Sequence, residues 1–239
     1  MRLSWRRKLI KNEELRMKVR VKKVVFIFIL CSILSGSLFA QSFSQERKID
    51  SLTVLTELDS LKNMFGTNKE IPARYELEIL KALSRFPELE DITISFKVQK
   101  IKTTLNTRPT VASLFFRSKC KRKYIIRIDE STSPTKVTLK DANFNARIGV
   151  FGHEFNHIID YSNKDFFGVL GRGFAYASKK SKEKFEKEID QKTIARGLGW
   201  QLYDWSYYVL NKSNGTKKYK EFKRLIYLEP GEVKKAVSL

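Results

Sequence analysis

The two histidines of this 239-residue chain lie four residues apart, in the hexapeptide GHEFNH at 152–157. Residues at this spacing share one face of an α-helix, so His153 and His157 can offer two imidazole nitrogens to a single metal ion. Glu154 follows the first histidine and lies at the edge of the same face. Its carboxylate can therefore reach a water molecule beside the ion and act as a general base. The hexapeptide predicts a metal site with the groups that hydrolysis requires.

A catalytic zinc ion needs a third protein ligand, and no further histidine is present. Asp160 is three residues beyond His157 on nearly the same helix face, but its side chain is short, and we interpret it as a supporting or helix-end acid. Glu186 and Asp190 are four residues apart and share a face of a later predicted helix. One of them could bind the ion while the other accepts a hydrogen bond from a ligand histidine and fixes its tautomer.

The segments HEFNH and EKEID together resemble the gluzincins, the thermolysin-like zinc peptidases in which a third ligand comes from an E-x-x-A-D helix. The resemblance covers residues 144–200 and implies a zincin-like fold with one zinc ion. The chain departs from the pattern at Ile189, where the family prefers alanine. The residue roles that the resemblance implies are metal ligands at His153, His157 and Glu186, a general base at Glu154, and a carboxylate behind a ligand histidine at Asp190.

Hydrolysis also requires a hydrogen-bond donor for the transition state. Tyr203 and Arg196 are the candidates that we retain, because they follow closely after the third-ligand segment; Tyr161 and Tyr207 are further candidates. An extended substrate could add to a sheet edge beside the metal, and the sequence YIIRI at 124–128 is the expected edge strand.

Residues 17–40 have the layout of a secretory signal peptide, with a basic stretch, a short apolar run and small residues before the expected cleavage site at Ala40. We therefore expect an exported, periplasmic or extracellular protein. A membrane anchor is the alternative, although the apolar run is shorter than the roughly 20 residues that a spanning helix needs. Lipidation at Cys31 would require a small preceding residue, and Met17 is an alternative start.

The chain is strongly basic, with 47 Lys and Arg against 26 Asp and Glu and a formal net charge of +21. The basic residues are densest at 117–123 and 217–224. No nucleic-acid-binding motif accompanies them, so we expect a solvated basic surface, no nucleic-acid partner and, as the functional interpretation, electrostatic association with anionic envelope surfaces. Cys120 would be the single cysteine of the cleaved chain, which excludes an internal disulfide.

The pattern of apolar residues predicts helices, then strands, then helices, which is an α+β domain with a small mixed or antiparallel sheet followed by an active-site helix and a third-ligand helix. We expect a single domain over 41–239, after an N-terminal extension and signal peptide over 1–40. Residues 162–180 are predicted to be an irregular loop, and Pro230 to begin a tail. The predicted strands cover 91–99, 107–116 and 123–130. The predicted helices cover 45–64, 73–86, 144–161, 181–197, 200–210 and 217–228.

Three functions are compatible with these features. The first is an exported, monomeric zinc metallopeptidase or related amide hydrolase that acts on peptides or proteins. The second is a catalytically inactive, zinc-stabilised envelope interaction protein, which a closed site with Asp160 as a fourth protein ligand would favour. The third is a basic binding protein in which the histidine spacing is accidental.

Overall fold

The computed structural model describes residues 43–238. The predicted signal peptide and its cleavage site at Ala40 lie outside the described residues. The chain from Ser42 to Leu239 forms one compact unit. Within the described part of the chain, no helix is both long enough and apolar enough to cross a membrane.

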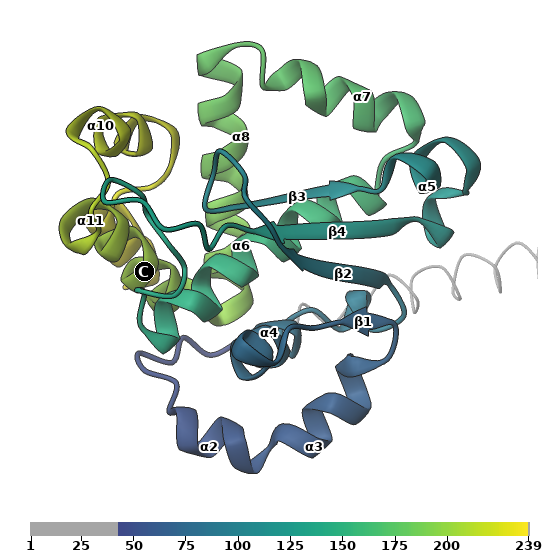
Figure 1. The fold of residues 1–239 in the computed structure, drawn as a ribbon, viewed down its shortest axis with the longest axis horizontal. Helices are drawn as coiled ribbons and strands as arrows, with labels where there is room; N and C mark the ends of the chain where they lie inside the picture. Colours follow the sequence, from purple (N-terminus) through teal and green to yellow (C-terminus); the bar gives the residue numbers. More distant parts are fainter. Residues whose placement is uncertain (1–42, 239) are drawn as a thin grey trace, which may run out of the picture. The chain divides into compact units, whose positions relative to one another are not determined.

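A four-stranded mixed sheet lies at the centre of this unit (Figure 1). Its strands are β1 (Lys69–Glu70), β2 (Thr93–Val98), β3 (Leu105–Pro109) and β4 (Lys123–Ile128). The order across the sheet is β1-β2-β4-β3; β1, β2 and β4 are parallel, and β3 is antiparallel to β4. The expected small mixed sheet is therefore confirmed. The prediction that 124–128 forms the edge is wrong, because β4 lies between β2 and β3.

Side chains of the central strands alternate between a buried and a more exposed face. Ile94 and Phe96 of β2, and Tyr124, Ile126 and Ile128 of β4, are buried in the main hydrophobic core. The residues between them, Ser95, Ile125 and Arg127, are partly exposed. This period of two places one face of the sheet against the helices and leaves the other closer to solvent.

The described residues form ten α-helices in addition to the sheet. α6 is the longest and packs against β3 and the helices α4, α8 and α9. Three of these helices precede β2 in the sequence: α2 (Ser51–Thr56), α3 (Leu58–Leu61) and α4 (Glu76–Leu83). The remaining helices are α5 (Val111–Phe116), α6 (Phe144–Ser162), α7 (Phe166–Ala175), α8 (Lys179–Thr193), α9 (Gly199–Tyr207), α10 (Lys217–Ile226) and α11 (Pro230–Val237).

α6 begins and runs as its sequence predicts. The side chain of Asn143 accepts a hydrogen bond from the amide of Ala146 and caps the helix. Phe151 and Phe155 are fully buried and contact Phe96 of the sheet with ring centroids 6.1 and 6.3 Å apart. One face of α6 is thereby fixed to the sheet, which leaves its other faces for α8 and α9.

Two glycines allow neighbouring segments to approach α6 closely. A Cβ atom added at Gly149 would lie 2.3 Å from the backbone of Gln201, and one at Gly152 would lie 2.5 Å from the side chain of Leu198. Between α8 and α9 the chain turns at Gly197, whose φ of +75° favours glycine. The predicted break at 197–199 is confirmed, and it returns α9 to the side of α6.

Several predicted elements differ from the structure. Residues 107–116 are not one strand, because Pro109 ends the β3 ladder and the apolar run after it forms α5. The predicted tail after Pro230 is the helix α11, which a capping box between Glu229 and Glu232 begins. The predicted helix over 45–64 is divided into α2, α3 and a π-helical turn.

The segment 162–180, predicted to be an irregular loop, contains α7 instead. Its glycines lower helix propensity, but the side chain of Asp165 accepts a hydrogen bond of 2.7 Å from the amide of Gly168 and caps the first turn. Later along α7, Arg172 forms a bidentate ion pair with Asp160 of α6. These tertiary and capping contacts stabilise a helix that the local sequence disfavours.

Candidate metal centre

His153 and His157 occupy successive turns of α6, and both imidazoles are buried. Their Nε2 atoms lie 3.1 Å apart, and the ring planes are inclined by 76°. The helix spacing therefore directs one nitrogen of each ring to the same point, as the sequence predicts.

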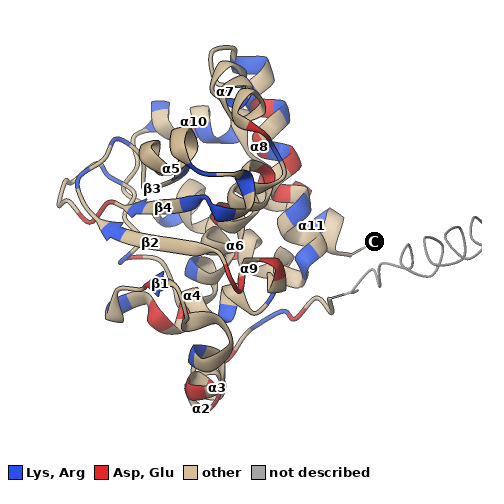
Figure 2. Ribbon diagram, turned by 90° about the vertical axis from the view of Figure 1, so that its right-hand side faces the viewer, with Lys and Arg blue, Asp and Glu red and all other residues tan. Residues whose placement is uncertain are grey.

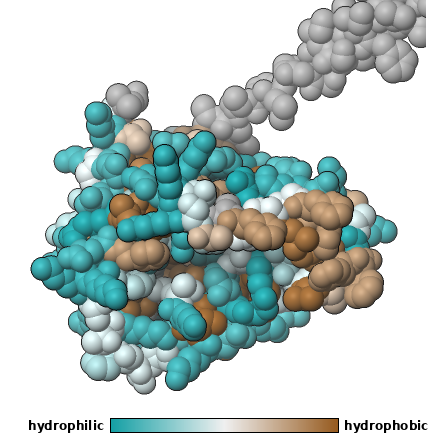
Figure 3. All heavy atoms as spheres, turned by 90° about the horizontal axis from the view of Figure 1, so that it is seen from above, coloured by the Kyte–Doolittle hydropathy of each residue, from teal (hydrophilic) through white to brown (hydrophobic). Residues whose placement is uncertain are grey.

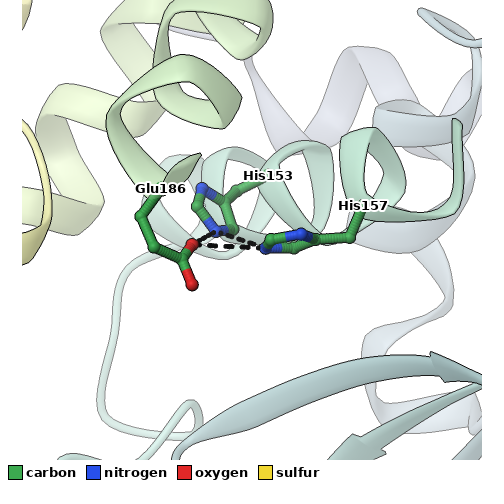
Figure 4. Close-up of side chains that lie close together, drawn as sticks. All are labelled: His153, His157 and Glu186. Atoms are coloured by element: carbon green, nitrogen blue, oxygen red, sulfur yellow. Dashed lines mark hydrogen bonds and ion pairs between the residues drawn. The ribbon is translucent and has the colours of Figure 1, made fainter. Parts of the chain in front are cut away.

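Glu186 reaches this point from α8 (Figure 4). Its Oε2 atom lies 3.2 Å from Nε2 of His153 and 3.3 Å from Nε2 of His157. The carboxylate is buried, and burial alone would raise its pKa, but the imidazoles, that of His157 first, hold the pKa well below its usual range. The group at the centre of the fold is thus a carboxylate anion facing two imidazoles.

The three converging atoms fit a metal ion. Tetrahedral ligand atoms about 2.0–2.1 Å from zinc lie roughly 3.3 Å from one another, which matches the three separations measured here. Oε2 of Glu186 is buried, yet no well-directed hydrogen bond reaches it from the described residues. Burying an anionic oxygen without a hydrogen-bond donor costs free energy, and a bound cation would offset this cost. The buried group of His153, His157 and Glu186 could hold a metal ion.

Asp190 orients the first histidine from the other side. Its Oδ1 atom lies 2.8 Å from Nδ1 of His153, and its Oδ2 atom accepts a hydrogen bond of 2.9 Å from the amide of Leu228. Burial alone would lower the pKa of His153, but the hydrogen bond to Asp190 and the proximity of Glu186 raise it to about 10. Hydrogen bonding at Nδ1 leaves Nε2 of His153 to face the proposed ion position.

α8 is held at this distance from α6 by polar contacts between the two helices. The side-chain amide of Asn156 donates to the hydroxyl of Thr193 at 3.0 Å, and that hydroxyl donates to the carbonyl of Ile189. Ile189 is itself fully buried. Its bulk, where the gluzincin pattern prefers alanine, does not prevent Glu186 from reaching the histidines.

Three tyrosines surround the group. The hydroxyl of Tyr176 donates to Oε1 of Glu186 at 2.8 Å, the ring of Tyr161 stacks beside His157, and the ring of Tyr227 lies 5.6 Å from His153. Burial is the first cause that raises the pKa of all three, followed by the negative charge of Glu154 for Tyr161 and of Glu186 for Tyr176 and Tyr227. They therefore remain protonated hydrogen-bond donors. Sequence reasoning named Tyr161 and missed the other two, because no residue spacing links the loop predicted over 162–180 or the helix predicted over 217–228 to the histidines.

A cavity of about 70 Å³ opens beside His153 and Glu154. Glu154 is largely buried, and among the described residues no side chain is hydrogen-bonded to its carboxylate. Lys223 and Tyr227 contribute to the wall, with the ammonium of Lys223 4.2 Å from the centre of the Tyr227 ring. The apolar part of the wall comes from Leu105, Val150, Leu202, Trp205, Val209, Leu210 and Leu228. Glu154 thus borders a space that a small molecule or a side chain could enter.

The structure does not bring the two sequence-predicted transition-state donors to this group. Arg196 forms a bidentate ion pair with Glu88, at 2.5 and 2.9 Å. Tyr203 packs against Trp200 and Tyr207, and the guanidinium of Arg47 lies over its ring. Among the described residues, Tyr176 and Tyr227 are the tyrosines that contact this group instead, through Glu186 and His153 respectively.

No protein-family model, no curated protein and no solved structure matches this chain. The candidate site is therefore supported by its own geometry and chemistry.

Asp160 is absent from the group of ligand atoms. Arg172 donates two hydrogen bonds to its carboxylate, at 2.7 and 2.6 Å, and Lys164 lies 3.3 Å away. Burial alone would raise the pKa of Asp160, but the hydrogen bonds from Arg172 hold it below its usual range. The carboxylate of Asp160 thus links α7 to α6 through Arg172.

Replacing Asp160 by asparagine is expected to lower the free energy of unfolding at pH 7 by about 1–3 kcal/mol, the usual worth of charge-assisted hydrogen bonds. Because the pKa is lower in the folded state, this stabilisation is complete above the unfolded value of about 3.9 and is lost as the pH falls through the folded value. Urea unfolding of wild type and Asp160→Asn across this range measures it. Asp59→Asn, at an exposed position without an ion pair in the described structure, is the control. A stability difference that does not change with pH would contradict the assignment.

Proposed function

We propose that this chain is an exported zinc metallopeptidase with a zincin-like arrangement of its metal helix and third-ligand helix. The observation that carries the proposal is the convergence of the two Nε2 atoms and Oε2 of Glu186 at separations of 3.1–3.3 Å, with Glu154 bordering a cavity beside them. Two imidazoles and one carboxylate are a ligand combination that occurs in catalytic zinc sites. Export is supported by the sequence of residues 17–40 alone.

The residues around the ion position have distinct roles in this proposal. When bound, zinc would supply a Lewis acid that makes water more acidic and polarises a carbonyl group. Glu154 accepts a proton from the attacking water and passes it to the leaving amine. Tyr176 holds Oε1 of Glu186 and leaves Oε2 for the ion. Tyr227, which lines the cavity with a protonated hydroxyl, is the group that we assign as hydrogen-bond donor to the reacting carbonyl.

The sheet edge offers a place for an extended substrate. β3 pairs with β4 on one side only and has no strand partner on its other side among the described residues. Leu105 at the start of β3 also lines the cavity next to His153 and Glu154. A peptide that adds to this edge would pass the cavity, so main-chain hydrogen bonds could hold it while one side chain enters the apolar space.

The alternative of an inactive, zinc-stabilised interaction protein would require a closed site with four protein ligands. Asp160, the candidate for a fourth protein ligand, is bound to Arg172 instead. The accessible cavity next to Glu154 also favours an open position over a closed one. We therefore assign the enzymatic function ahead of the structural one.

Metal removal tests the proposal. Purified full-length chain with one equivalent of zinc is expected to cleave a mixture of quenched fluorescent peptides. Prolonged treatment with 1,10-phenanthroline should abolish cleavage, because it removes the ion, and added zinc should restore it. Zinc content is measured in the same samples. Cleavage that continues in metal-free protein, or zinc-loaded protein that cleaves no peptide in the mixture, would contradict the proposal.

A further inference from the structure

α7 presents an apolar face to solvent. Phe167, Leu170 and Phe174 recur at the spacing of one helix face, and they are 77%, 40% and 77% exposed. The opposite side carries Val169, which is buried, and Arg172, which is paired with Asp160. The helix is therefore held to the protein by its inner side while its most apolar side remains without a partner in the described structure.

α5 extends this apolar surface. Phe115 and Phe116 are 59% and 87% exposed. The ring of Phe115 lies 5.1 Å from that of Phe166, so the two helices contribute to one continuous surface. Figure 3 shows hydrophobic side chains gathered at the right of the view, over α5 and α7. We call this surface the aromatic face; its members are Phe115, Phe116, Phe167, Leu170 and Phe174.

Basic residues border the aromatic face. Arg117, Lys119 and Lys121 follow Phe116 directly and are exposed, and the sequence from 111 to 123 contains no Asp or Glu. Figure 2 shows basic residues on the segment between α5 and β4, whereas acidic and basic residues alternate along α8. Exposed aromatic rings beside Lys and Arg are typical of surfaces that enter the interface of an anionic bilayer.

We propose that the aromatic face docks on the surface of an anionic lipid bilayer. The phenylalanine rings enter the boundary between headgroups and acyl chains, and Arg117, Lys119 and Lys121 contact the phosphates. Charge complementarity favours this occupant over a second copy of the chain, because pairing two aromatic faces would bring the two basic borders together. This docking is peripheral and does not depend on metal binding or hydrolysis.

Vesicle binding tests the proposal with the full-length chain. Wild type is expected to co-sediment with vesicles of phosphatidylglycerol and phosphatidylcholine more strongly than with phosphatidylcholine alone. The triple variant Phe116→Ser, Phe167→Ser, Phe174→Ser should bind the anionic vesicles at least tenfold more weakly. Leu52→Ser with Leu55→Ser, which alters two exposed leucines of α2, is the matched control and should bind as wild type does.

A fluorescent dye beside the aromatic face reports whether this face contacts the lipid, independently of other parts of the chain that bind vesicles. Cys120 is exposed and adjacent to the basic border, so an environment-sensitive dye can be attached there in a Cys31→Ser background. Anionic vesicles should shift its emission to the blue. The same dye at Leu55→Cys, with both native cysteines replaced by serine, should not respond.

The proposal is overturned if the dye on Cys120 shows no blue shift while the protein co-sediments with vesicles. It is also overturned if the triple variant and the leucine control bind equally. A triple variant that changes the molecular mass in solution from dimer to monomer, without a change in vesicle binding, would assign the aromatic face to self-association instead.

Discussion

Replacing Glu154 by glutamine is expected to lower the rate of peptide hydrolysis by roughly 100-fold or more while the zinc content stays at the wild-type level. The amide has nearly the same shape as the carboxylate but cannot accept a proton from water. The carboxylate of Glu154 is not one of the three converging ligand groups, so its replacement leaves the candidate metal ligands His153, His157 and Glu186 intact. Peptide cleavage and metal analysis on the same preparation measure both effects.

Glu188→Gln is the matched control for this variant. Glu188 lies on α8 and forms an ion pair with Lys192, with both side chains partly exposed. Its variant should hydrolyse peptides at the wild-type rate. A Glu154→Gln protein that retains full activity would remove the general base from the proposal, and one that loses its zinc would place Glu154 among the ligands instead.

Replacing Glu186 by alanine is expected to weaken zinc binding well beyond tenfold, because even the partners behind ligands typically contribute 10–100-fold to metal affinity. The change removes Oε2, which faces both histidines, and also the acceptor of the Tyr176 hydroxyl. Competition with a chromogenic chelator measures the affinity. Circular dichroism on the same sample establishes that the variant is folded.

Glu183→Ala provides the control on the same helix. Glu183 lies three residues before Glu186 and pairs with Lys187 near the surface. Its variant should bind zinc as wild type does. If Glu186→Ala also holds zinc as tightly as wild type, the third ligand comes from elsewhere, and the match between the measured separations and a tetrahedral ion is accidental.

Local rules in the sequence predict the two pairs of this site, His153 with His157 and Glu186 with Asp190, and the resemblance to gluzincins selects Glu186 as the third ligand. A spacing of four on one helix directs two side chains to one point, and the same spacing places Glu186 and Asp190 on one face of α8. What the spacing does not specify is the distance between the two helices. The structure supplies it through the contact of Asn156 with Thr193.

The tyrosines of the site could not be predicted in the same way. Tyr176 follows α7 directly, and Tyr227 follows α10. Both reach the histidines through tertiary packing rather than a sequence interval. α7 was also missed, because Gly168, Gly171 and Gly173 oppose a helix locally while the cap at Asp165 and the ion pair of Arg172 stabilise it.

The fold class could be predicted from the sequence more completely than the individual helices and strands. Alternating apolar residues located β2 and β4, and the order of elements indicated an α+β domain. The apolar run 111–116 shows where such reasoning fails, since a short run of this kind fits a strand or a buried helix equally well. The structure makes it α5, with aromatic side chains facing solvent.

The contact between Gly149 and Gln201 has a consequence for how selectivity could evolve in this protein. The residues that follow these two positions, Val150 and Leu202, both line the cavity beside His153 and Glu154. A Cβ atom at position 149 would lie 2.3 Å from the backbone of Gln201, so a side chain there would require α9 to shift relative to α6 and would move Val150 and Leu202 relative to each other. The shape of the cavity therefore depends on a position that does not line it, so related chains could differ in the group that the cavity admits without a change at His153, Glu154, His157 or Glu186.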